Sequence, residues 1–309
     1  MVARSAMPLV LLGAGFVVAG LLLLDVIGGA VYTLILAAAG ALIVLILSLA
    51  GQRDDKIVWL RGKVDIQDLV AIGLIYLAVV LGFRLAFTVF TTTNVLGLFL
   101  SFAASLAIGV AAPIYYSVWL RGRPLASLGI GLGDWRVTVA LALVFGAVQY
   151  AITLARIAYP RVETWLPLLV MALVVGLFEA ILFRGFIQNT LEASFGLAPA
   201  VAVAAGLYGL YHIGYGMGLD EIALLIGLGL VYAVAFRVAG SVFVLWPLLT
   251  PLGSLFNQLG TATFTLPMES IFGFADVFGV MVVLIWLARR HERRATGHIS
   301  RQGAATAAI

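Results

Sequence analysis

The sequence predicts an all-α membrane protein, a polytopic bundle of about ten transmembrane helices with both termini in the cytoplasm. Of its 309 residues, 63% are hydrophobic and only 10% are charged, which is too apolar for a soluble fold. The apolar residues form long runs rather than the alternating segments of a membrane β-barrel. Basic residues gather in the connections that would lie on one side of a membrane. The chain has no cysteine, which excludes disulfides and thiolate chemistry.

Ten apolar runs are near or above the roughly 20 residues that a helix needs to cross a bilayer. They cover residues 7–24, 28–50, 67–90, 95–119, 137–158, 165–190, 197–216, 221–238, 241–260 and 270–288. We interpret the first run as a retained helix, because no convincing small-residue cleavage site follows it. The ninth run contains Pro247 and Pro251, so we expect it to be kinked or broken.

The basic residues predict how these helices are oriented. With the N-terminus in the cytoplasm, 15 of the 18 lysines and arginines fall on the cytoplasmic side. The exceptions are Arg84, Arg156 and Arg161. We divide the chain into about four N-terminal transmembrane helices, a membrane core and a C-terminal part with the last transmembrane helix and a basic cytoplasmic tail, which we expect to be disordered from Arg289 on. These parts cover residues 1–119, 120–260 and 261–309.

A carboxylate and an imidazole are predicted to lie at the same depth in the membrane. Glu179 stands 16 residues before the turn near Phe195, and His212 stands 17 residues after it. At about 1.5 Å per residue, both lie roughly 24 Å from that turn. With the turn a little way out in the headgroups, both are near the middle of a hydrocarbon core of about 30 Å. A carboxylate there costs at least a few kcal/mol and usually faces the bundle interior. We therefore predict a functional pair with Glu179 as a general base; the alternative is a carboxyl and an imidazole that only pack helices together.

Other polar residues in the apolar runs are less specific. Arg184 follows Glu179 by five residues, about 140° away around an ideal α-helix, so the two do not form a simple i,i+4 pair. Asn257, in the ninth run, could donate into the bundle or join two helices by a hydrogen bond. Three more polar residues have no recognisable partner and are interpreted as structural: Arg84, Tyr150 and Asp276.

The polar residues follow one another in a recognisable order. Residues 179–185 read EAILFRG, Tyr208 precedes His212 by four residues, and Gly240-Ser241 leads to Asn257. This order resembles the CAAX-protease and bacteriocin-processing family of intramembrane endopeptidases, whose pattern is EExxxR, then FxxxH, then HxxxN. The resemblance covers about residues 120–260.

The resemblance implies an activity and a set of site residues. A glutamate-activated water would attack a peptide carbonyl, with Glu179 as the base and His212 as its partner. Asn257 would donate to the developing oxyanion, and Arg184 and Tyr208 would support the site. One glutamate and one histidine are too few ligands for zinc, so we predict no metal and no cofactor.

Two positions depart from the family pattern and leave the function open. Ala180 stands where the second glutamate belongs, and Gly253, or Pro251 in another alignment, stands where the second histidine belongs. A slow intramembrane endopeptidase acting on a peptide or membrane protein is therefore weighed against an inactive family member that serves as a membrane scaffold or binding protein. The broken ninth run and the buried carboxylate also suggest a third class, a transporter.

The sequence also indicates partners and location. The chain is expected in the cell membrane, with the lipid bilayer as its surroundings and a peptide or membrane protein as its substrate. No basic patch or Gly-rich phosphate loop points to nucleic acid or nucleotide, and the sequence does not specify an oligomeric state.

Cysteine labelling tests the predicted orientation without background, because the chain has no cysteine of its own. A cysteine replacing Val58 should react with a membrane-impermeant maleimide from the cytoplasmic side only. A cysteine replacing Gly218 should react from the outside only. Labelling in intact cells and in inverted vesicles separates the two cases, and the reverse pattern would overturn the orientation.

Overall fold

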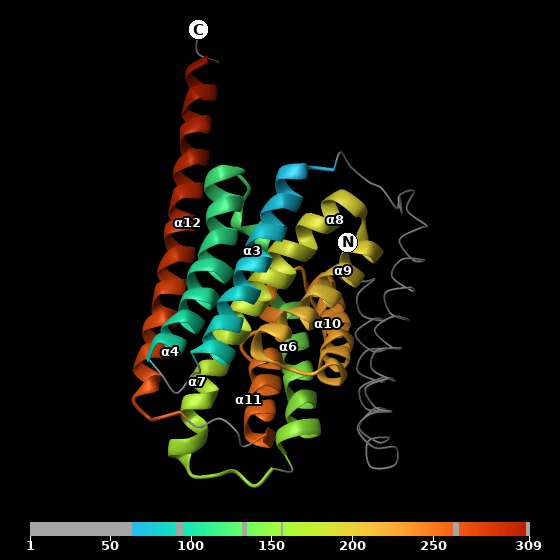
Figure 1. Ribbon diagram of the computed structural model, residues 1–309. Helices are drawn as coiled ribbons and strands as arrows, with labels where there is room; N and C mark the ends of the chain where they lie inside the picture. Colours follow the sequence, from blue (N-terminus) through green and yellow to red (C-terminus); the bar gives the residue numbers. More distant parts are fainter. Residues whose placement is uncertain (1–63, 91–94, 132–134, 156, 262–265, 307–309) are drawn as a thin grey trace.

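The computed structural model describes residues 64–90, 95–131, 135–155, 157–261 and 266–306 (Figure 1). Every regular element in these ranges is a helix. The first two predicted spans, 7–24 and 28–50, lie outside the described residues.

Six helical segments in the described ranges are long and apolar enough to cross a membrane. They are Ile66–Val89, Leu96–Leu120, Val162–Phe195, Leu197–Tyr215, Glu221–Ala239 and Ser270–Arg294. Each coincides with one of the predicted runs, which confirms an all-helical, multi-pass membrane protein.

Several spans consist of more than one helix. The α-helices are α3 (Ile66–Arg84), α4 (Val95–Ala103), α5 (Ala112–Ile114), α6 (Trp135–Gln149), α7 (Val162–Glu179), α8 (Asn189–Phe195), α9 (Leu197–Leu210), α10 (Leu219–Ala239), α11 (Leu249–Thr261) and α12 (Ser270–Thr306).

Two predicted spans are shorter than expected. The fifth is the apolar helix α6, followed by a π-helical turn at Tyr150–Leu154. The ninth is a short 3₁₀-helix, Val242–Val244, followed by the 13-residue helix α11. The predicted break in the ninth run is therefore found before α11, in the segment that contains Pro247, a residue without a backbone N–H to donate.

The C-terminal tail differs from its prediction. Helix α12 continues past Arg289 as far as Thr306 and extends beyond the rest of the bundle (Figure 1). The disordered tail predicted from Arg289 is thus wrong. Its sequence is rich in arginine and alanine, which have high helix propensity, and it continues a helix that has already been nucleated.

The centre of the bundle is one continuous helical segment made of α7, a π-helix (Ala180–Gln188) and α8. All nine residues of the π-helix are buried. Segments before and after it in the sequence, α3 and α9 to α11, lie around this central segment (Figure 1). The predicted site residues Glu179 and Arg184 lie in its middle, so the fold places polar groups at its most enclosed point.

The π-helix approaches its neighbour closely at Gly185. A short 3₁₀-helix, Leu125–Leu128, packs against it, and a Cβ added at Gly185 would overlap the backbone carbonyl of Leu128. By contrast, a Cβ added at Gly206 on α9 would meet no atom within 4 Å. Of these two glycines, only Gly185 is required by the close packing of two backbones.

We expect Gly185→Ala to lower the free energy of unfolding by about 1–3 kcal/mol, because a backbone carbonyl cannot move away as a side chain can. Gly206→Ala should be neutral or stabilising by up to about 1 kcal/mol, since it only removes the flexibility of a helical glycine. Thermal unfolding of both variants in detergent micelles measures the difference. Equal stability of the two variants would contradict the close approach.

Candidate functional site

Glu179 lies where α7 passes into the π-helix, and only 7% of its surface is exposed. Its carboxylate accepts two hydrogen bonds from tyrosines. The Tyr211 hydroxyl donates to Oε1, and the Tyr208 hydroxyl lies 3.4 Å from Oε2. A carboxylate removed from water is stable only with such donors, so the two tyrosines are what allow a glutamate at this depth.

His212 faces the same carboxylate from the 3₁₀-helix Tyr211–Tyr215, which follows α9. Its Nδ1 lies 2.9 Å from the Tyr208 backbone oxygen. A carbonyl oxygen can only accept, so this contact assigns the proton to Nδ1 and leaves Nε2 as an acceptor. Nε2 is the atom that faces Glu179, 4.0 Å from Oε1. The structure thus brings together the two residues that the depth count placed at one level.

The short gap between Nε2 and Oε1 has a chemical consequence. Two acceptors at 4.0 Å do not bond to each other. A molecule with two O–H groups, such as water, can donate to both at once. The pair can therefore orient a water molecule.

Arg184 is close to this pair because the helix is not an α-helix here. The 140° separation from Glu179 assumed α-helical geometry, but a π-helix bonds residues five apart and so brings them to nearly the same face. The guanidinium carbon lies 5.3 Å from the centre of the Tyr208 ring, and Nη1 lies 3.5 Å from Gln188 Oε1. Arg184 is 1% exposed, and its Nη2 has no hydrogen-bond partner among the described residues. Tyr208 therefore connects the buried cation to the buried carboxylate.

Aromatic rings enclose the pair on the side of α3. Phe83 lies 6.1 Å from the Tyr211 ring and 4.7 Å from the Tyr215 ring, between centroids. Arg84, interpreted from the sequence as structural, donates from Nη1 to the Ile213 oxygen at 3.3 Å. Helix α3 thereby holds the 3₁₀-helix that carries His212.

Sequence reasoning missed Tyr211, the residue that donates to Glu179 Oε1. A signal was present, because Tyr208, Tyr211 and Tyr215 recur at i, i+3 and i+7 and so share one helical face with a hydroxyl at each position. All three rings pack against the His212 ring, with centroids 4.0–5.5 Å away.

Asn257 lies on α11 and is exposed, unlike the buried Glu179 and His212. Its role as an oxyanion donor stays a prediction. One turn earlier, the space above Gly253 is bordered by polar groups: an added Cβ would lie 3.4 Å from the Tyr232 hydroxyl and 3.5 Å from Gln149 Nε2. Gly253, one of the two positions that could correspond to the second histidine of the family pattern, thus has polar surroundings without a histidine.

The described residues contain no group of three or more histidine, aspartate and glutamate side chains that could hold a metal ion.

The fold and the site define a multi-pass membrane protein with a buried carboxylate and imidazole in contact. Residues 161–250 match the family model described as type II CAAX prenyl endopeptidase Rce1-like. This match confirms, over residues 161–250, the resemblance to CAAX-type endopeptidases that the motifs predicted. The matched segment contains Glu179 and His212 and ends seven residues before Asn257. No curated protein and no solved structure matches the chain.

The two tyrosines on Glu179 should differ in their effect on stability. Tyr211→Phe removes the closer donor and should lower the free energy of unfolding by about 1–3 kcal/mol, because it leaves part of a buried carboxylate unpaired. Tyr208→Phe loses a contact at 3.4 Å and keeps its ring under Arg184, so it should cost less than about 1 kcal/mol. Chemical unfolding in micelles compares them, and a larger loss for Tyr208→Phe would reverse our ranking of the two bonds.

Proposed function

We propose that the protein is an intramembrane endopeptidase of the cell membrane that cleaves a peptide or a membrane protein. One observation carries the proposal: Glu179 and His212 are in contact, buried, and both inside the segment that matches an endopeptidase family. Residues 120–260 would form its catalytic core. No metal is required for the steps below.

In the proposed reaction, water sits beside the two side chains and donates to both Glu179 Oε1 and His212 Nε2. Glu179 takes a proton from the water while the water oxygen attacks the carbonyl carbon of the scissile peptide. The carbon–nitrogen bond then breaks, and the proton held by Glu179 passes to the leaving amine. His212 orients the water, and its Nδ1–H remains bonded to the Tyr208 carbonyl oxygen.

The surrounding residues would support each charge in this sequence. Tyr211 and Tyr208 fix the carboxylate by donating to its two oxygens. Arg184 supplies positive charge on the far side of the Tyr208 ring. Asn257 would donate to the oxyanion that forms on the substrate carbonyl, which is the step where preorganised donors contribute most.

The direct test compares new peptide termini by mass spectrometry in membranes that contain the wild-type protein, Glu179→Gln or His212→Ala. We expect cleavage products that require the wild-type protein and are lost in both variants. Glu163→Gln is the matched control, since Glu163 is an exposed glutamate in the first turn of the same helix. It should leave the products unchanged. Asn257→Ala should reduce their rate of formation about 100- to 1,000-fold if it supplies an oxyanion donor.

Two outcomes would contradict the proposal. Products that persist in Glu179→Gln would place the catalytic base elsewhere. The absence of any wild-type products, with all variants folded and inserted, would favour the inactive scaffold that Ala180 and Gly253 suggest.

A further inference from the structure

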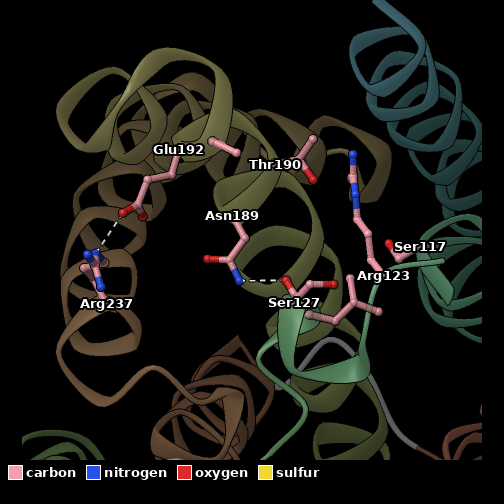
Figure 2. Close-up of a pocket in the computed structure, with 9 residues that line it drawn as sticks. Ser117, Arg123, Ser127, Asn189, Thr190, Glu192 and Arg237 are labelled. Carbon is pink, nitrogen blue, oxygen red and sulfur yellow. Dashed lines mark hydrogen bonds and ion pairs between the residues drawn. The ribbon is translucent and has the colours of Figure 1, made fainter. Parts of the chain in front are cut away.

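A polar cavity of about 590 Å³ lies apart from the Glu179 site (Figure 2). It is lined by the end of the span Leu96–Leu120, the 3₁₀-helix Leu125–Leu128, α8 and the end of α10. Its lining residues are Ser117, Arg123, Ser127, Leu128, Asn189, Thr190, Glu192, Ala193 and Arg237. Arg123 lies on one side of the cavity and Arg237 on the other, with Asn189 and Ser127 between them.

The cavity lies where membrane spans end. Ser117 is three residues from the end of the span Leu96–Leu120, and Arg237 is two residues from the end of Glu221–Ala239. Asn189 and Thr190 begin α8, the last part of the span Val162–Phe195. Polar groups at the ends of several spans lie at the level of lipid headgroups rather than in the hydrocarbon core.

The cavity wall holds a hydrogen-bond donor that the protein itself leaves unused. The Ser127 hydroxyl is buried and has no hydrogen-bond partner among the described residues. Ser117 and Thr190 also contribute hydroxyl-bearing side chains and are only 1% and 6% exposed. A buried hydroxyl without a partner destabilises the protein, and a ligand that accepts its hydrogen bond would remove that cost.

The charges of the wall favour an anion. Arg237 Nε lies 2.9 Å from Glu192 Oε1, and Arg123 Nη2 lies 2.5 Å from Asp68 Oδ2, behind the cavity wall. Each of these ion pairs leaves other N–H groups of the guanidinium available, since arginine has five. The lining itself contains two arginines against one glutamate, so its own charge is positive.

We propose that this cavity binds a phosphate group, with Arg123 and the Ser127 hydroxyl as its main donors and Arg237 as a second positive charge across the cavity. Guanidinium groups match phosphate oxygens in pairs, and serine and threonine hydroxyls complete the shell. The depth of the cavity favours the headgroup of a phospholipid as the source of the phosphate; a soluble phosphate ester carries the same chemistry. The proposal does not depend on the endopeptidase activity.

The test uses native mass spectrometry of the purified full-length protein in detergent. Three probes are titrated: phosphatidylglycerol, diacylglycerol with the same acyl chains, and glycerol 3-phosphate. We expect phosphatidylglycerol to be retained at least about 10-fold more tightly than diacylglycerol, because only the former has the phosphate. Displacement by glycerol 3-phosphate at equal concentration would identify a soluble ester as the preferred source. Equal retention of the two lipids would overturn the phosphate site.

Three variants locate the binding. Arg123→Gln should weaken phosphatidylglycerol binding about 10-fold or more, and Ser127→Ala about 3- to 10-fold. Arg161→Gln is the matched control, because Arg161 is an exposed arginine next to the opposite end of the span Val162–Phe195, which carries the cavity residues Asn189 and Thr190. It should bind like the wild type.

Ser127→Ala also separates ligand binding from folding. Without lipid it should be as stable as the wild type or more stable, since it removes an unpartnered buried hydroxyl. Its lower stability without lipid, or unchanged lipid binding in both Ser127→Ala and Arg123→Gln, would overturn the proposal.

Discussion

The buried carboxylate of Glu179 is the constraint on which the arrangement of this bundle depends. A charged or polar group in an apolar interior is stable only when its hydrogen bonds are made inside the protein. The Tyr211 and Tyr208 hydroxyls, both from the region around the end of α9, make those bonds. The turn between α8 and α9 must therefore return the chain antiparallel and in register with α7. The same register places His212 beside the carboxylate.

The π-helix gives the site its second charge. In an α-helix, Arg184 would point away from Glu179, and its guanidinium would need a partner elsewhere in the bundle. The wider turn of the π-helix brings the Arg184 guanidinium over the face of the Tyr208 ring, where it makes a cation–π contact. π-Helical turns are uncommon and concentrate at functional sites. Here the turn follows directly after the candidate base, so the unusual backbone and the candidate chemistry occupy the same residues.

The sequence predicted the depth of the site better than its contacts. Counting residues from the turn near Phe195 placed Glu179 and His212 together, because helical rise is nearly constant and both residues lie on long apolar helices. The predicted angle between Arg184 and Glu179 was wrong, because nothing in the local sequence AILFRGFIQ distinguishes a π-helix from an α-helix. Tyr211 was missed because a tyrosine next to a histidine is normally interpreted as a packing residue. Only the structure shows that its hydroxyl donates to the Glu179 carboxylate. The ten-span count also depended on runs of apolar residues, and such runs do not distinguish a full span from the shorter α6 and α11.

For the proposed endopeptidase, the short helix α11 offers a way for a buried site to meet water and a polar substrate. Thirteen residues cover only about 20 Å at 1.5 Å per residue, less than a hydrocarbon core of about 30 Å. Irregular backbone before such a helix is tolerated at membrane depth only where protein or a water-filled space surrounds it. Helix α11 packs against α7, which carries Glu179, and presents the exposed Asn257 on the same helix as Gly253. Gly253 is bordered by the Tyr232 hydroxyl and the Gln149 amide, and the Tyr232 ring lies 5.8 Å from that of Tyr208. Tyr232 thus connects the polar surroundings of Gly253 on α11 to Tyr208, whose hydroxyl contacts the Glu179 carboxylate.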